Sequence, residues 1–342
     1  MTDIKAEMDA LPGVDPRAPL LHVTDLHVEF RTRDGIAKAV NGVNFWLNPG
    51  ETLAILGESG CGKSVTAQAV MGILDSPGQV TAGEIRYRGV DLLKLPAEQR
   101  RKVRANRVAM IFQDALSALN PVFPVGFQLA ELFRVHRGMS RRDAKARAIE
   151  LLDLVRIPAA RQRVNDYPHQ FSGGMRQRVM IAMALALDPE VLIADEPTTA
   201  LDVTVQAQIM SLLAELQRER TMGLVLITHD MGVVADVADR ISVMYAGRVV
   251  EEAPVHEIYS RPAHPYTRAL LDSIPRLHRK GRQLNVISGL PPALTDQPAG
   301  CAFHPRCEFA RDLCTAGAPP PTYQITPYRV AACHRIREVL GV

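Results

Sequence analysis

The chain carries the stretch ETLAILGESGCGKSVTAQAVM at residues 51–71. Its apolar first part, Glu51 to Leu56, predicts a buried strand, and its last part, up to Met71, predicts a helix. The glycine-rich loop between them has the form G-x-x-x-x-G-K-S, in which backbone N–H groups can face phosphate oxygens, a lysine adds positive charge and a serine can bind Mg²⁺. The stretch therefore predicts a nucleotide site, with these contacts: Gly57, Ser59, Gly60, Cys61, Gly62, Lys63, Ser64 and Val65.

A second apolar strand, residues 190–194, ends in the acidic pair Asp195-Glu196. Asp195 is suited to hold Mg²⁺ directly or through water, and Glu196 to act as general base toward an attacking water, a role worth about 10²–10⁴ in rate. Gln113 follows the expected strand 108–112 and could contact the Mg²⁺ or the water; the alternative is an ordinary loop glutamine. His229 closes the expected strand 223–228, from which it could reach a γ-phosphate.

A second phosphate cradle is predicted at Phe171–Met175, which reads FSGGM. A small polar residue and two glycines at the start of a helix expose backbone N–H groups that can meet a phosphate. One nucleotide needs only one such cradle. The second cradle therefore indicates a site shared between two subunits.

The remaining pattern alternates between helices and fully apolar strands, which predicts a parallel sheet covered on both faces. The expected helices are residues 174–187, 203–219 and 231–237. Residues 20–30 and 37–47 predict an antiparallel piece, and residues 241–252 predict a hairpin that turns at Ala246-Gly247. Ala144, Ala148 and Leu151 have the spacing of a buried helix face.

This pattern divides the chain into three parts. Residues 1–19 are expected to form a loose tail, and residues 20–255 a nucleotide-binding domain with an inserted helical subdomain at 115–170. Residues 256–342, rich in proline, histidine and cysteine, are expected to form a C-terminal extension.

Composition argues against several functions. The formal charge of +3 is too small to indicate nucleic acid, and the basic runs at 100–104 and 141–145 lack the aromatics that would stack on bases, so no nucleic-acid partner is expected. No run approaches the ~18 apolar residues of a membrane helix. The first residues have no signal-peptide pattern. We therefore expect a cytoplasmic protein.

The ordered motifs resemble the nucleotide-binding subunits of ABC transporters over residues 20–255. The motifs are the following: Gly57–Ser64, Gln113, Phe171–Met175, Ala194–Pro197, Ala200–Asp202 and His229. The resemblance implies an α/β P-loop NTPase domain of the ABC type, with a mostly parallel sheet, an antiparallel β piece and the helical subdomain. It also implies a head-to-tail dimer in which each ATP lies between one subunit's phosphate loop and the other subunit's Phe171–Met175 turn.

On this resemblance, Ser172, Gly173 and Gly174 bind the partner's γ-phosphate and Asp202 lies at the dimer seam. Gln113 couples hydrolysis to membrane subunits, and His229 senses the γ-phosphate. The chain departs from the family in two ways. First, Met175 stands where many members have glutamine. The second departure concerns the aromatic near the N-terminal strands that usually stacks on adenine: Phe30 is the best candidate for it, and the alternative is that Phe30 is a core residue of its strand.

The C-terminal segments RPAHPYTRAL at 261–270 and GCAFHPRC at 300–307 resemble the extension of oligopeptide, dipeptide and nickel importers. The resemblance implies an ATPase subunit that energises peptide uptake from the cytoplasmic face of the inner membrane. Its expected partners are two membrane-spanning permease subunits, an external substrate-binding protein and a second ATP-binding subunit. We favour a related heterodimer partner, with a homodimer as the alternative. Alternative cargoes are nickel, glutathione and oligosaccharides, and a more distant alternative is a soluble ABC ATPase acting on ribosomes or DNA.

Four cysteines, Cys301, Cys307, Cys314 and Cys333, have the spacing C-x₅-C-x₆-C-x₁₈-C. In a reducing cytosol their grouping favours a metal site over disulfides. Thiolates suit zinc and iron–sulfur clusters alike, and His304 and His334 could replace a thiolate at zinc. The resemblance implies a [4Fe–4S] cluster, which we favour over Zn²⁺ as a staple for the proline-rich extension.

Overall fold

The computed structural model describes residues 13–114, 118–199, 201–274 and 287–341. Most of the expected tail, the first residues of the expected helical subdomain and Ala200 lie outside these ranges. The chain divides into two units. The first unit comprises Met1–Leu21, Leu47–Glu51 and Arg86–Val225, and the second comprises His22–Trp46, Thr52–Ile85 and Leu226–Val342. The expected domain boundaries near residues 20 and 255 stay predictions.

The first unit combines two short parallel strands with a group of helices. Its elements are β5 (Val90–Asp91), α3 (Ala97–Asn106), β6 (Val108–Ile111), α5 (Val125–Arg137), α6 (Arg141–Leu154), α7 (Ala160–Arg163), the 3-10 turn η1 (Pro168–Gln170), α8 (Gly173–Leu185), β7 (Val191–Asp195) and α9 (Val203–Arg220). β6 and β7 are paired in parallel. β7 is buried along its whole length, as expected for a strand whose two faces are both covered.

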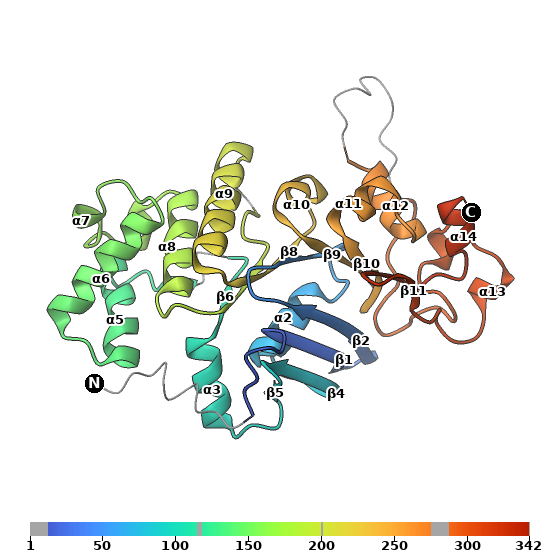
Figure 1. The fold of residues 1–342 in the computed structure, drawn as a ribbon, viewed down its shortest axis with the longest axis horizontal. Helices are drawn as coiled ribbons and strands as arrows, with labels where there is room; N and C mark the ends of the chain where they lie inside the picture. Colours follow the sequence, from blue (N-terminus) through green and yellow to red (C-terminus); the bar gives the residue numbers. More distant parts are fainter. Residues whose placement is uncertain (1–12, 115–117, 200, 275–286, 342) are drawn as a thin grey trace. The chain divides into compact units, whose positions relative to one another are not determined.

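Figure 1 shows α5, α6 and α7 gathered beside α8, with α9 next to it. The buried face of α6 consists of Ala144, Ala148, Leu151 and Leu152, which confirms the expected helix face. The side chain of Ser140 accepts the N–H of Asp143 at 3.2 Å and so caps the first turn of α6. Within the described residues, no helix is long and apolar enough to cross a membrane.

The second unit contains most of two sheets. Its elements are β1 (Leu21–Thr32), β2 (Gly35–Leu47), β3 (Thr52–Leu56), α2 (Lys63–Met71), β4 (Gly78–Tyr87), α10 (Met231–Val237), β9 (Arg240–Tyr245), β10 (Arg248–Pro254), α11 (Val255–Ser260), α12 (Pro265–Asp272), the 3-10 turn η3 (His304–Arg306), α13 (Asp312–Thr315), β11 (Tyr323–Thr326), β12 (Arg329–Ala331) and α14 (Ile336–Leu340). β8 (Gly223–Thr228) begins in the first unit and ends in the second.

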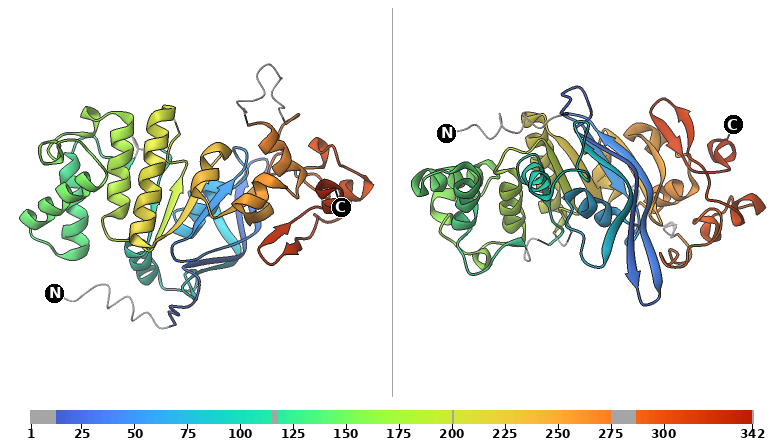
Figure 2. Two further views of the ribbon diagram at one scale, coloured as in Figure 1. Left: turned by 45° about the horizontal axis from the view of Figure 1, so that its top comes forward. Right: turned by 90° about the horizontal axis from the view of Figure 1, so that it is seen from below.

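In the second unit the strands follow the order β11-β12-β10-β9-β3, and β2-β1-β4 form the other sheet. β3 and β9 are parallel, which confirms a parallel sheet behind the phosphate loop. β9 and β10 form the expected antiparallel hairpin. Sequence reasoning missed β11 and β12, which extend this sheet from the C-terminal end of the chain through the pairing of β12 with β10 and are drawn in red in Figure 2.

A buried ion pair fixes the C-terminal extension to β10. Glu251 is fully buried on β10. Its carboxylate accepts bonds from Arg329 on β12 at 2.9 Å and from the backbone N–H groups of Ala263 at 2.8 Å and His264 at 2.9 Å. A buried carboxylate satisfied by three donors is held tightly, because losing one of them would leave charge uncompensated.

Three rings pack beside this ion pair. The centroid of Tyr245 on β9 lies 4.6 Å from that of Tyr266 on α12 and 5.2 Å from that of Phe303. All three are buried. Together with the strand pairing, the rings and the ion pair give the extension the anchor that the sequence had led us to expect from a metal.

The buried His264 makes stability depend on pH. It is only 1% exposed, its Nδ1 accepts the N–H of Tyr266 at 3.1 Å, and burial lowers its pKa from 6.5 to about 3. Because the unfolded chain then binds the proton more tightly, this residue should cost stability as pH falls from about 6.5 toward 3, with a limiting slope of about 1.4 kcal/mol per pH unit.

We expect His264→Asn, which keeps an acceptor for the N–H of Tyr266, to flatten this slope. Urea unfolding of both proteins between pH 7 and 5 measures it. The quantity compared is the slope of the free energy of unfolding with pH, and not its absolute value, because His264→Asn also removes the packing of the imidazole ring. Parallel pH profiles for the two proteins would show that His264 is not the titrating group.

The start of α8 packs closely on α9 at Gly174. A methyl group added there would lie 2.5 Å from Cγ1 of Val205, whereas one added at Gly173 would meet only Cδ2 of Leu201 at 3.5 Å. We therefore expect Gly174→Ala to destabilise the protein by about 1–3 kcal/mol through overpacking, and Gly173→Ala to cost less than about 1 kcal/mol. Chemical denaturation measures both. The double variant Gly174→Ala/Val205→Ala should regain most of the loss; a double variant no more stable than Gly174→Ala would refute the packing explanation.

Candidate nucleotide-binding site

The phosphate loop of the second unit approaches neighbouring backbone too closely for side chains at two positions. Gly62 precedes α2 with φ near +104°, a conformation that favours glycine. A Cβ on Gly62 would lie 2.2 Å from the carbonyl oxygen of Ala39, and one on Gly57 would lie 2.3 Å from that of Met244. These two glycines therefore let the loop sit directly against β2 and β9.

Lys63 lies back over this loop. Its side chain is almost buried, at 5% exposed, and its Nζ donates to the carbonyl oxygens of Gly57 at 2.7 Å and Glu58 at 3.0 Å. The sulfur of Cys61, 3.9 Å from Nζ, is a weak third partner. An ammonium group has three donors, so a phosphate oxygen can take the third position without displacing the two carbonyls. Burial raises the pKa of the Cys61 thiol, which marks it as a packed side chain.

In the first unit the structure brings Gln113 and Glu196 together. Oε2 of Glu196 accepts a hydrogen bond from Nε2 of Gln113 at 3.1 Å and another from Oγ1 of Thr199 at 2.8 Å. Glu196 follows β7 in the left-handed region, with φ near +46°. Strain at such a position is typical of functional sites. Sequence reasoning missed Thr199, which orients the same carboxylate.

Asp195 ends β7 and is only 4% exposed. Its carboxylate, the hydroxyl of Ser64 and the amide oxygen of Gln113 are each hard oxygen donors of the kind that Mg²⁺ prefers, so the chemistry of each side chain fits the expected metal. That the three side chains hold one ion stays a prediction. His229 directly follows β8 and is exposed.

The predicted second cradle opens α8. Ser172 and Gly173 are exposed, and α8 begins at Gly173 with Ser172 as its capping residue. Oγ of Ser172 accepts the N–H of Met175 at 3.4 Å. Asp202 caps α9 in the same way, accepting the N–H of Val205 at 3.0 Å. The exposed turn can present its remaining N–H groups to an anion.

Phe30, the candidate for adenine stacking, is half-buried on β1. A Cβ on Gly78 of β4 would lie 2.6 Å from Cε1 of Phe30. This ring therefore packs on a neighbouring strand, as a core residue would, and its stacking role stays a prediction.

The iron–sulfur prediction is wrong. Within the described residues, no group of three or more histidine, cysteine, aspartate or glutamate side chains is arranged to hold a metal ion, and all four C-terminal cysteines are free. Burial raises the pKa of Cys301, that of Cys307 to about 11 and that of Cys333 to about 12, as is usual for thiols packed away from water. The sulfur of Cys333 accepts the N–H of Arg335 at 3.3 Å. The same finding removes the support for zinc at Cys301, Cys307, Cys314 and Cys333.

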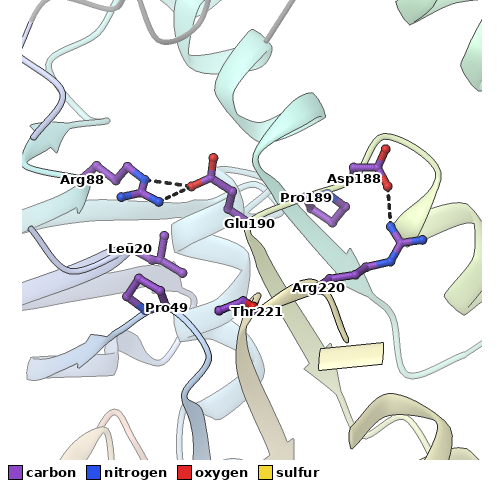
Figure 3. A pocket seen from close by; sticks show the side chains of 8 residues that line it. All are labelled: Leu20, Pro49, Arg88, Asp188, Pro189, Glu190, Arg220 and Thr221. Atoms are coloured by element: carbon purple, nitrogen blue, oxygen red, sulfur yellow. Dashed lines mark hydrogen bonds and ion pairs between the residues drawn. The ribbon is translucent and has the colours of Figure 1, made fainter. Parts of the chain in front are cut away.

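A separate pocket of about 280 Å³ lies in the first unit. Four of its side chains form two ion pairs, Arg88 with Glu190 at 2.7 Å and Arg220 with Asp188 (Figure 3). Because these charges neutralise one another and none of the lining residues belongs to a nucleotide motif, the pocket adds nothing to the candidate site.

Glu58, inside the phosphate loop, was not singled out by sequence reasoning. Its carboxylate contacts Arg306 at 2.7 and 2.9 Å, and its N–H donates to the hydroxyl of Tyr266 at 2.8 Å. The two partners of Glu58, Tyr266 and Arg306, lie in the HPY and HPR segments of the extension. The sequence does not reveal these contacts, because Tyr266 is 208 residues from Glu58 along the chain and Arg306 is 248 residues from it.

Comparisons with known proteins show the family to which the chain belongs. The ABC transporter family model matches residues 40–199, and the model of the oligopeptide/dipeptide transporter C-terminal region matches residues 250–314. The oligopeptide transport ATP-binding protein OppD of Salmonella typhimurium is 49% identical over 331 residues, which cover 97% of this chain and 98% of that protein. OppD of Escherichia coli K12 is 50% identical over 321 residues, 94% of each chain.

Solved structures share the cassette fold. A dimeric ATP-binding cassette bound to ADP and phosphate aligns with a TM-score of 0.62 and 29% identity, covering 69% of this chain and 98% of that one. CbiO1 of Clostridium perfringens, part of an ABC transporter complex, aligns with a TM-score of 0.61 and 29% identity over 71% of this chain and 91% of that one. This chain is therefore an ABC ATPase and belongs to the ABC transporter family, in the branch that carries the oligopeptide/dipeptide transporter C-terminal region.

Proposed function

We propose that this chain is the ATP-hydrolysing subunit of an importer that takes up oligopeptides. The observation that carries the proposal is its identity of about 50% with oligopeptide transport ATP-binding proteins over nearly the whole length of both chains. The similarity also covers the C-terminal region. A similarity limited to the ATP-binding cassette would not include this region. Nickel, glutathione and oligosaccharide cargoes, and work on ribosomes or DNA, are not favoured by these relatives.

ATP is bound through the phosphate loop, with Lys63 donating to the phosphates and the N–H groups of Ser59–Val65 facing them. Ser64, Asp195 and Gln113 would hold Mg²⁺, which would neutralise charge on the phosphates. Glu196 accepts a proton from the water whose oxygen attacks the γ-phosphorus, and ADP leaves. Gln113 and Thr199 support this role because both donate hydrogen bonds to the Glu196 carboxylate and so fix its orientation.

The site is completed by a second ATP-binding subunit. Ser172, Gly173 and Gly174 contact the γ-phosphate held by the partner, Asp202 lies at the seam and His229 contacts the γ-phosphate. The exposure of the turn at Ser172 supports this assignment, as does the dimeric cassette that aligns with the chain. We propose a related, non-identical partner subunit.

The complex works at the cytoplasmic face of the inner membrane. The chain is a peripheral subunit attached to two membrane-spanning permease subunits, and an external binding protein delivers the peptide. This assignment is supported by the relatives of the chain, which are named as ATP-binding proteins of oligopeptide transport.

Replacing Glu196 by glutamine tests the assignment of the base. E196Q should lower the rate of ATP hydrolysis by about 10²–10⁴, because the amide cannot accept the proton, and should leave ATP affinity near that of the wild type. Steady-state phosphate release and calorimetric ATP binding measure the two effects. Lys63→Ala is the contrasting control, since it should weaken binding itself. Hydrolysis at the wild-type rate in E196Q would remove Glu196 from this role.

Co-purification tests the assignment of the complex. Detergent-solubilised membranes from cells that express the tagged chain should yield two permeases and a second ATP-binding subunit. The reconstituted complex should take up labelled oligopeptides in an ATP-dependent way, and should lose uptake with E196Q. Uptake of nickel, glutathione or oligosaccharide in place of peptides would overturn the cargo assignment. Recovery of ribosomes or DNA without permeases would overturn the transport function.

A further inference from the structure

The C-terminal extension places one arginine on the phosphate loop. Arg306, in η3, has a side chain only 4% exposed. Its two terminal nitrogens donate to the two carboxylate oxygens of Glu58, at 2.7 and 2.9 Å. The two residues are 248 positions apart in sequence and lie in the same unit. A bidentate pair of this kind is both strong and geometrically specific.

Other bonds fix the guanidinium in this place. Nε of Arg306 donates to the carbonyl oxygen of Ser288 at 2.9 Å, and a terminal nitrogen lies 3.3 Å from the hydroxyl of Tyr245. The contacts with Glu58 and Tyr245 raise the pKa of Arg306, so its charge is permanent. Arg306 therefore holds a fixed positive charge against the phosphate loop.

Glu58 is also tied through its backbone. Its N–H donates to the hydroxyl of Tyr266 at 2.8 Å, and its carbonyl oxygen accepts from Lys63 at 3.0 Å. The N–H of Glu58 is thus used by the extension, which leaves the N–H groups of Ser59–Val65 for the proposed phosphate contacts. Tyr266 and Arg306 both lie within the region matched as the oligopeptide/dipeptide transporter C-terminal region.

A carboxylate inside a phosphate loop has an electrostatic cost. Like charges repel, and the phosphates of ATP are negative, so an unpaired Glu58 would oppose nucleotide binding. Lys63 cannot serve both groups, since it contacts the carbonyl of Glu58 and not its carboxylate. The counter-charge at the carboxylate comes from Arg306.

We propose that Arg306 is a positioning residue for nucleotide: it neutralises the carboxylate of Glu58, so that the affinity of the phosphate loop for ATP depends on the C-terminal extension. The inference deepens the proposed function and rests on the role of this loop in binding ATP. It assigns to the extension a direct effect on the nucleotide site within its own subunit.

A cycle of variants in the full-length chain separates charge neutralisation from a purely mechanical role. Calorimetric titration with MgATP and MgADP gives the affinities of Arg306→Gln, Glu58→Gln and the double variant. We expect Arg306→Gln to weaken binding about tenfold, because it leaves the Glu58 carboxylate unpaired. Glu58→Gln and the double variant should stay within about threefold of the wild type, because no negative charge remains. Higher salt should reduce the defect of Arg306→Gln, since salt screens the repulsion.

A mechanical clamp predicts a different result. Every variant in the cycle loses the ion pair, so Glu58→Gln would then bind as weakly as Arg306→Gln, and the double variant would not recover. That pattern, or wild-type affinity in Arg306→Gln, overturns the proposal.

Two further variants keep the test decisive. Arg306→Lys retains the charge but loses the bidentate contact, so it should bind MgATP more tightly than Arg306→Gln does; an affinity as low as that of Arg306→Gln also overturns the proposal. Arg311, in the same extension, is exposed and donates to the carbonyl oxygen of Ala310. Arg311→Gln therefore removes a charge away from Glu58 and should leave the affinity for MgATP unchanged. Urea midpoints without nucleotide identify any variant that fails to fold. Absence of ATP binding by the wild-type chain would refute the proposed function itself, which is a separate outcome.

Discussion

The close approach of the phosphate loop to two backbone carbonyls is the constraint on which the second unit depends. Gly62 lies against the carbonyl of Ala39 on β2, and Gly57 against that of Met244 on β9. These strands belong to different sheets, so the loop contacts the backbone of both sheets. No side chain fits at either contact. The shape of the nucleotide cradle is therefore set by backbone packing before any ligand arrives.

The C-terminal extension is held by charges and rings. Glu251 is buried and satisfied by Arg329 and two backbone N–H groups, while Tyr266 and Phe303 pack on Tyr245. Such a buried pair contributes little net stability compared with an apolar pair of similar size, but breaking it by removing one partner costs several kcal/mol. It therefore specifies one arrangement of the extension, which is the role that we had assigned to a metal.

Local patterns in the sequence predicted local structure well. The strand before Gly57, the helix after Lys63 and the hairpin at Ala246 needed only neighbouring residues. The pairing of β12 with β10 and the contact of Arg306 with Glu58 join residues that are far apart in sequence, and composition carries no information about such distances. The cysteine prediction failed for the same reason, because regular spacing along the chain does not bring sulfur atoms to the corners of one coordination polyhedron.

The two arginine–glutamate pairs also show how the extension relates to the nucleotide domain. Glu58 and Glu251 precede residue 255, whereas Arg306 and Arg329 follow it. Both arginines are almost buried, with side chains 4% and 5% exposed. Without the extension, one carboxylate would remain unpaired in the sheet and the other in the phosphate loop. An uncompensated buried charge is strongly unfavourable, and this penalty applies to Glu251, whose side chain is fully buried. Glu58 is 26% exposed, so its loss of Arg306 acts mainly through the negative charge left beside the phosphates, and a change in the extension's contacts would be transmitted in this way to the site that binds ATP.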